Sequence, residues 1–98
     1  MNTKRTSLFL MANLGAEVSR IISLKEKNEL GLAKEALARA NKIISQIKEL
    51  PDMQTRLGEI DTLSEVIENI IKPNPSLDIP KKHIMSYFIP FSLRLMAR

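Results

Sequence analysis

The first apolar pattern in the chain has the period of an α-helix. Large apolar side chains recur three or four positions apart: Leu10, Leu14, Val18, Ile21 and Leu24. Three further apolar side chains lie on the other side of the same helix: Phe9, Ala12 and Ala16. The pattern predicts a helix over residues 7–27 that is buried on more than one side. Its small residues Ala12, Gly15 and Ser19 form a patch that a second helix can approach closely.

Two amphipathic helices follow. Residues 29–50 carry one apolar stripe: Ala33, Ala36, Leu37, Ala40, Ile43, Ile44 and Ile47. Asn28 is the expected N-cap of this helix, and Pro51 ends it because proline disfavours helical geometry at the preceding residue. A third helix is predicted over residues 53–72, and its buried positions are Met53, Leu57, Ile60, Leu63, Ile67, Ile70 and Ile71.

Prolines mark the limits of the last element. Residues 73–76, Pro-Asn-Pro-Ser, form a break, and Pro80 suits the first turn of a helix over residues 80–96. The predicted inner face of this helix carries Ile84, Phe88, Phe91 and Leu95. Because Pro90 lies inside the span, we predict a kink or two short helices.

These elements predict an all-α protein in which residues 1–98 form one small domain. Since short connections force neighbouring helices together, we expect a three-helix up-down-up bundle. The fourth, proline-interrupted segment is expected to close its open side. The predicted buried set is Leu14, Val18, Ile21, Leu37, Ala40, Ile44, Ile47, Leu57, Ile60, Ile67, Phe88 and Phe91.

Composition limits the cysteine chemistry, the location and the binding partners that we expect for the protein. The chain has no cysteine, which excludes disulfides and thiolate metal sites and fits a cytoplasmic location. It has no uninterrupted run of about 18 apolar residues, so we expect no membrane-spanning helix. The net charge of +4 is the sum of +4 for residues 1–50, −4 for 51–71 and +4 for 72–98. A modest surplus of this kind aids solubility and permits weak contact with polyanions.

Candidate catalytic and metal-binding groups are few. His83 is the sole histidine, and the nearest acid in sequence is Asp78, whereas a general base needs an orienting acid and zinc needs three or four ligands. Asp61, Glu65 and Glu68 share one side of the third helix, but the helical di-iron pattern also needs a histidine three residues after a glutamate. We interpret these carboxylates as a solvated acidic face, with pairing to a basic helix or weak metal binding as alternatives. We expect no enzymatic activity, cofactor or small-molecule substrate.

Lysines support an alternative function. Four of them are candidates for phosphate contact: Lys34, Lys42, Lys81 and Lys82. Nucleic-acid binding usually adds aromatic stacking platforms or base-reading side chains, and the aromatic residues here lie in apolar surroundings. A nucleic-acid-associated basic protein with non-specific phosphate contacts is therefore the second hypothesis.

Aromatic residues gather at the end of the chain. The last twelve residues hold three of its four aromatics, and with the apolar first helix they provide more apolar surface than three helices need. We therefore predict a non-enzymatic helical protein–protein interaction module, as a homo-oligomer or an accessory subunit. Its predicted interface is Phe9, Ala12, Ala16, Tyr87, Phe88, Phe91 and Leu95. Two other roles for this last segment stay open: a cover for its own core and an interfacial membrane anchor.

A further pattern spans the first two helices and rests on Leu14, Gly15, Ala33, Leu37 and Ala40. Over residues 10–45 it resembles a single tetratricopeptide-type helical hairpin, which implies two antiparallel helices. Only one copy occurs, whereas repeats of that family need about three copies to bury a core. The whole chain also resembles short all-helical proteins with similar residues at 12–15 and 90–96, and this resemblance implies no particular activity.

Overall fold

The computed structural model describes residues 3–72 and 81–96, and within them all regular secondary structure is helical. The elements are α1 (Thr3–Glu26), α2 (Leu30–Lys48), the 3-10 helix η1 (Pro51–Arg56), α3 (Leu57–Ile71) and α4 (Lys81–Met96). No strand occurs in these two ranges, so the predicted all-α class is confirmed.

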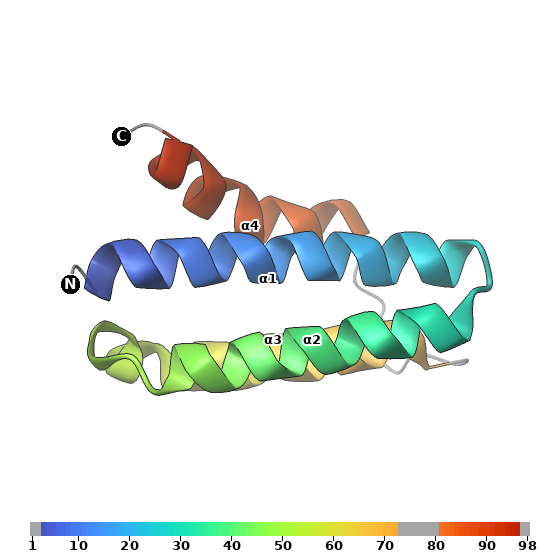
Figure 1. The fold of residues 1–98 in the computed structure, drawn as a ribbon, viewed down its shortest axis with the longest axis horizontal. Helices are drawn as coiled ribbons and strands as arrows, with labels where there is room; N and C mark the ends of the chain where they lie inside the picture. The colour runs from blue at the N-terminus through green and yellow to red at the C-terminus, as the bar shows by residue number, and fades with distance from the viewer. Residues whose placement is uncertain (1–2, 73–80, 97–98) are drawn as a thin grey trace.

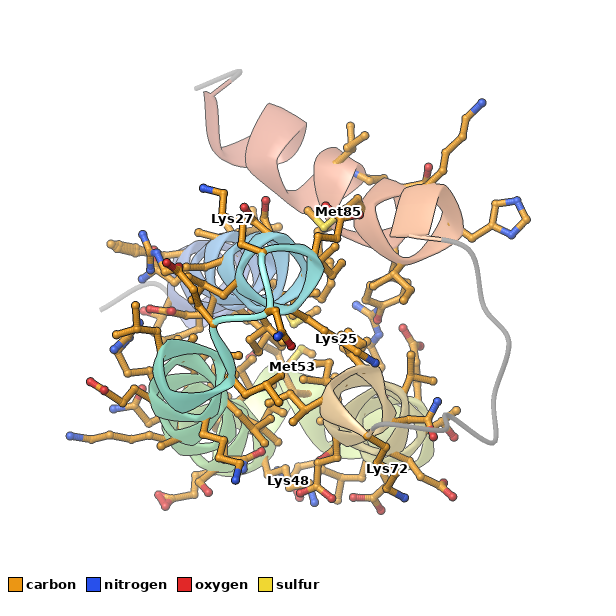
Figure 2. The ribbon with its side chains drawn as sticks, turned by 90° about the vertical axis from the view of Figure 1, so that its right-hand side faces the viewer. Lys25, Lys27, Lys48, Met53, Lys72 and Met85 are labelled. Carbon is orange, nitrogen blue, oxygen red and sulfur yellow. The ribbon has the colours of Figure 1, made fainter. Side chains whose placement is uncertain are left out.

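The helix α1 is the central element. It lies between α4 on one side and the α2–α3 pair on the other, and successive α-helices run in opposite directions (Figure 1). The end-on view shows α2 and α3 side by side beneath α1 (Figure 2). The backbone of α4 packs against α1, whereas α4 reaches α3 through side chains.

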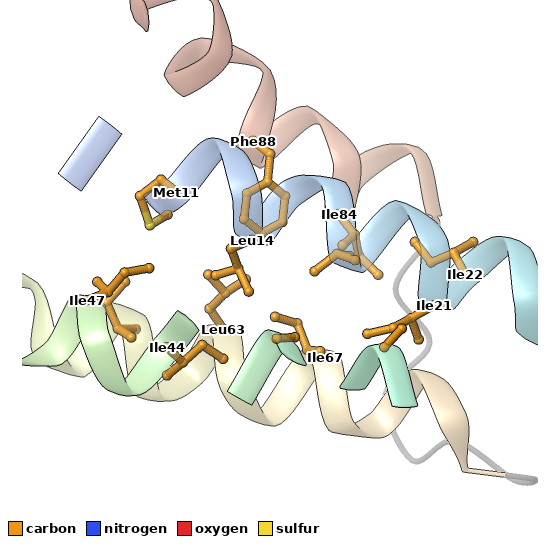
Figure 3. Close-up of a cluster of buried hydrophobic side chains, with 14 of the residues drawn as sticks. Met11, Leu14, Ile21, Ile22, Ile44, Ile47, Leu63, Ile67, Ile84 and Phe88 are labelled. Atoms are coloured by element: carbon orange, nitrogen blue, oxygen red, sulfur yellow. The ribbon is translucent and has the colours of Figure 1, made fainter. Parts of the chain in front are cut away.

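One apolar core joins all of these elements. Its buried members are Met11, Leu14, Val18, Ile21, Ile22, Ala36, Ala40, Ile44, Ile47, Met53, Ile60, Leu63, Ile67, Ile84 and Phe88. Figure 3 shows Ile84 and Phe88 pointing from α4 into this cluster. Two residues of the predicted core, Leu37 and Leu57, are only half-buried. The small side chains of Ala36 and Ala40 occupy the buried face of α2, which leaves Leu37 at its edge.

Asn28 ends α1 instead of capping α2. Its φ of 60° is in the left-handed region, its N–H donates to the carbonyl of Lys25 (2.9 Å), and the N–H of Glu29 donates to the carbonyl of Leu24 (2.8 Å). This pair of bonds defines a Schellman motif. Asparagine serves in it because it tolerates the left-handed conformation better than other side-chain-bearing residues. The N-cap prediction for Asn28 was therefore wrong, and Glu29 precedes α2 without a side-chain cap hydrogen bond.

The predicted third helix begins as a tighter turn. Residues 51–56 form the 3-10 helix η1, which buries Met53, and the α-helix starts only at Leu57. The Gln54 amide donates to the carbonyls of Lys48 (2.7 Å) and Leu50 (3.0 Å). The first bond pairs the carbonyl of the last residue of α2. The Leu50 carbonyl also accepts from the N–H of Met53 (3.1 Å), and together these bonds hold the tight turn against α2.

The last helix continues through its internal proline. Pro90 lies inside α4, which runs from Lys81 to Met96 as one helix and not as two. Proline removes one backbone donor within a helix. The C-terminal part of α4 lies farther from α1 than its N-terminal part (Figure 1).

Part of α1 is long and apolar enough to cross a membrane. Residues Thr6–Glu26 meet this criterion by length and composition, with a mean hydropathy of 1.2 over an 18-residue window. Polar residues such as Asn13 interrupt its apolar runs, so only the hydropathy averaged over the window identifies this segment. Within the fold, 39% of that window is buried. Buried core helices and N-terminal signal sequences can have the same composition, so the expectation of no membrane-spanning helix stays a prediction.

Candidate protein-binding surfaces beside α4

The helix α4 meets α1 at Gly15. A Cβ atom at this position would lie 2.8 Å from Cβ and 2.9 Å from Cγ of Phe88, so only a glycine hydrogen fits there. The small-residue patch of α1 is thus the place where α4 makes its close approach. Phe88 is 2% exposed, and its ring packs edge-on against Tyr87 with centroids 5.2 Å apart. Phe88 therefore packs mainly within its own chain.

A groove of about 290 Å³, the α1–α4 groove, follows one side of this contact. It is lined by Ala12, Gly15, Ala16, Ser19, Met85, Phe88 and Ile89. Ile89 is 52% exposed on its α4 side. Phe9, which is 46% exposed, precedes Ala12 by three and Ala16 by seven positions and so shares their side of α1. The structure therefore places three predicted interface residues on one side of α1 and adds Ile89, which the sequence analysis missed.

The other side of α4 borders a second groove, the α3–α4 groove, of about 340 Å³. Its lining residues are Glu59, Thr62, Leu63, Val66, His83, Ile84 and Tyr87. Leu63 and Ile84 are nearly buried at its base, and Val66 is half-buried. Tyr87 belongs to this groove and not to the first one, so α4 separates it from the other predicted interface residues. The side chains of Phe91 and Leu95 lie outside the described residues.

A polar cluster links α4 to the start of α3. The guanidinium of Arg56 donates to both carboxylate oxygens of Glu59, with Nη2–Oε1 at 2.7 Å and Nε–Oε2 at 3.3 Å. The Tyr87 hydroxyl also donates to Glu59 Oε1. Hydrogen bonds from Arg56 and then Tyr87 lower the pKa of Glu59. Burial, and then the bond to the Glu59 carboxylate, raises the pKa of Tyr87 to about 12. A charged carboxylate and a neutral phenol at neutral pH make this cluster a fixed link between helices.

The other candidate chemical groups do not converge. Asp61 forms an ion pair with Lys48 of α2, whereas Glu65 and Glu68 are exposed. His83 is exposed at the rim of the α3–α4 groove. Within the described part of the chain, no three histidine, cysteine or acidic residues are arranged to hold a metal ion.

The lysines proposed for phosphate contact lie on different parts of the molecule. Lys34 and Lys42 are exposed on α2, and Lys82 is exposed on α4, on the opposite side of α1 (Figure 1). The side chain of Lys81 is outside the described residues. These positions do not form one continuous basic surface.

A different group of lysines lies at one end of the bundle. Lys25, Lys27 and Lys72 lie at the end that faces the viewer in Figure 2. Lys25 Nζ donates to the backbone carbonyl of Lys72 (2.8 Å), just beyond the last residue of α3. A cation at this point also suits the negative end of the helix dipole.

Comparisons with known proteins assign no family to the chain: no family model, no curated protein and no solved structure matches it. The two grooves beside α4 are therefore the features from which its function is inferred.

Proposed function

We propose that the protein is a helical protein–protein interaction module without enzymatic activity, and that it works as a homo-oligomer or as an accessory subunit. The observation that carries this proposal is the apolar surface left open beside α4, where Ile89 is 52% exposed. Contiguous exposed apolar surface of this kind is typical of binding sites in small proteins.

The shape of the two grooves supports a helical partner. The wall of the α1–α4 groove contributed by α1 consists of small side chains, and the α4 wall adds Met85 and Ile89. Small residues let a second backbone approach closely, and an amphipathic helix can place its apolar side chains into such a groove. The exposed surface inside both grooves is mainly apolar, and polar side chains border the α3–α4 groove at Glu59, Thr62, His83 and Tyr87.

Solution mass and one substitution in each groove test the proposal. Wild-type protein at about 100 μM, a concentration that populates micromolar complexes, is expected to have a mass above that of one chain or to retain a partner during affinity capture. Ile89→Lys or Val66→Lys should weaken at least one of these associations, because each places a charge in an apolar contact.

Leu32→Lys is the matched control. Leu32 is 50% exposed, lies on α2 and lines neither groove, so this variant should associate as the wild type does. A protein that stays strictly monomeric and retains no other protein would refute the interaction module.

A further inference from the structure

We infer, on the basis of the proposed interaction function, that the α1–α4 groove binds an acidic amphipathic helix of a different protein. The apolar face of that helix lies in the groove, and its carboxylates meet basic side chains at one end of the groove. The protein is then an accessory subunit of an acidic partner.

The α1 wall of the groove leaves room for the backbone of another helix. Ala12, Ala16 and Ser19 present only small side chains there. Two large apolar side chains border the same region, with Phe9 46% and Ile89 52% exposed. An apolar helix face placed between them would cover both side chains, as in other helix-in-groove complexes. A hollow of about 290 Å³ suits a convex helix better than a flat bilayer surface.

Basic side chains stand at one end of this groove. The helices α1 and α4 are antiparallel (Figure 1), and Phe88 of α4 lies over Gly15 of α1. Lys82 is six residues before Phe88, and Arg20 is five residues after Gly15. At 1.5 Å per residue these are displacements of about 9 and 8 Å toward the same end of the groove.

Both cations lie on the groove side of their helices. Lys82 precedes Ile89 by seven positions and Arg20 follows Ala16 by four, so each shares a helix side with a residue that lines the groove. Lys82 is exposed, and the Arg20 side chain is 53% exposed. Nη1 of Arg20 donates to Glu17 (2.9 Å). The remaining Arg20 donors have no acceptor among the described residues, so they are available to a partner carboxylate.

The acids of these two helices do not cancel this charge. Glu17 accepts from Arg20 and also from Nε of Arg39 (3.1 Å), so one carboxylate serves two guanidinium groups and one positive charge is left over. The other acid of α1, Glu26, already has a contact of its own. By sequence, α4 contains no aspartate or glutamate.

The charge of the helix layers excludes a second copy bound through the same groove. By sequence, α1 and α4 contain seven basic and two acidic residues, a net charge of +5. The other layer, α2, η1 and α3, contains five basic and six acidic residues, a net charge of −1. Two copies that met through their α1–α4 grooves would bring like charges together, which disfavours association. A nucleic acid would complement the charge but would leave the apolar side chains of Phe9 and Ile89 uncovered.

The position of the cations specifies the partner helix. It carries an apolar stripe with spacings of three and four residues. Its aspartates or glutamates lie about six residues from the centre of that stripe, because Lys82 and Arg20 lie about 8–9 Å from the contact between Gly15 and Phe88.

Selection from a display library of 20-residue amphipathic helical peptides tests this chemistry. The library keeps the apolar stripe and randomises the positions beside it. On the wild-type protein, we expect the enriched peptides to carry aspartate or glutamate about six residues from the centre of the stripe. The same selection on Lys82→Glu should lose this preference.

Fluorescence anisotropy of one enriched peptide then locates the contact. In low salt, Lys82→Glu should weaken its binding about tenfold or more, because it places like charges together. Ile89→Lys should weaken it at least as much, because it places a charge in an apolar contact. A peptide whose contacting carboxylate is replaced by lysine should bind Lys82→Glu better than it binds the wild type. Circular dichroism of each variant checks that the helices are intact.

The matched control is Lys42→Glu, which changes the net charge by the same amount at an exposed position of α2 outside both grooves. This variant should bind the peptide like the wild type. Equal weakening by Lys42→Glu and Lys82→Glu would show a non-specific attraction of polyanions and would overturn the inference. A library that yields no binder, or binders without the acidic preference, would also overturn it.

Two results would overturn the acidic partner and leave the interaction function standing. The first is peptide binding that is lost on Val66→Lys but not on Ile89→Lys, which would move the site to the α3–α4 groove. The second is self-association of the wild type, measured by sedimentation velocity, that Ile89→Lys abolishes, which would place a second copy in the α1–α4 groove.

Discussion

Replacement of Gly15 by alanine tests whether α4 docks on α1 as described. The new Cβ would lie 2.8 Å from Cβ of Phe88, whereas carbon atoms in contact are about 3.5–4.0 Å apart. A separation of about 1 Å must therefore be gained by moving Phe88 or the whole of α4. Overpacking of a well-packed core by one methyl group costs about 1–3 kcal/mol.

Helix propensity acts in the opposite direction. Alanine is favoured over glycine by about 1 kcal/mol inside a helix, so the expected net change for Gly15→Ala is a loss of about 0–2 kcal/mol in the free energy of unfolding. Gly58 provides the control, because a Cβ there meets no heavy atom within 4 Å. Gly58→Ala should be neutral or stabilise by up to about 1 kcal/mol. The difference between the two variants gives the free-energy cost of the steric clash with Phe88.

Urea denaturation followed by circular dichroism measures both free energies. A double-mutant cycle with Phe88→Ala adds a direct test of the contact. In the Phe88→Ala background, Gly15→Ala should lower the free energy of unfolding by less than it does in the wild-type background. If Gly15→Ala stabilised the protein as much as Gly58→Ala does, and showed no coupling to Phe88, the docking of α4 over Gly15 would be wrong.

Substitutions at three further positions test the contacts that define the fold. Asn28→Ala should destabilise the protein by about 1 kcal/mol, because alanine is poorly suited to the left-handed Schellman position. Asn28→Gly should not destabilise it, and chemical denaturation measures the free energy of unfolding of both variants. Tyr87→Phe should be less stable than wild type at neutral pH. Burial, and then the bond to Glu59, raises the pKa of Tyr87 from 10.0 to about 12 on folding, so this difference in stability should shrink as the pH rises between those values. A difference that stays constant would contradict the raised pKa of Tyr87. Ser7→Ala removes the 2.6 Å bond from Ser7 Oγ to Asp52 and should lower the free energy of unfolding by about 1 kcal/mol, whereas unchanged stability would show that this bond does not anchor η1.

Most of the fold follows from local periodicity. The stripe of Ile44, Ile47 and neighbouring alanines is buried as expected. The apolar face of an amphipathic helix is buried in a globular fold, whichever helix packs against it. The role of Asn28 could not be predicted in the same way. Asparagine is favoured both at N-caps and at left-handed positions after a helix, and the path of the backbone decides between the two.

The binding surfaces were only partly predictable. Phe9, Ala12 and Ala16 share one side of α1 by spacing alone, but no local pattern tells which side of α1 its neighbours cover. Ile89 follows Met85 by four positions, which is the spacing of a second apolar row on α4. This spacing could have predicted that Ile89 belongs to the surface. The Glu59–Tyr87 bond joins residues 28 positions apart, and no periodicity connects them.

The helix α4 has two structural roles. It covers its own core, because Ile84 and Phe88 are buried in the same cluster as residues of α1 and α3. It also creates the open surfaces, because a single helix laid on α1 leaves a groove on each of its sides. A variant that displaces α4 should therefore weaken folding and partner binding together. A charge placed at Ile89, which is 52% exposed at the α1–α4 groove, should weaken binding and leave the fold intact.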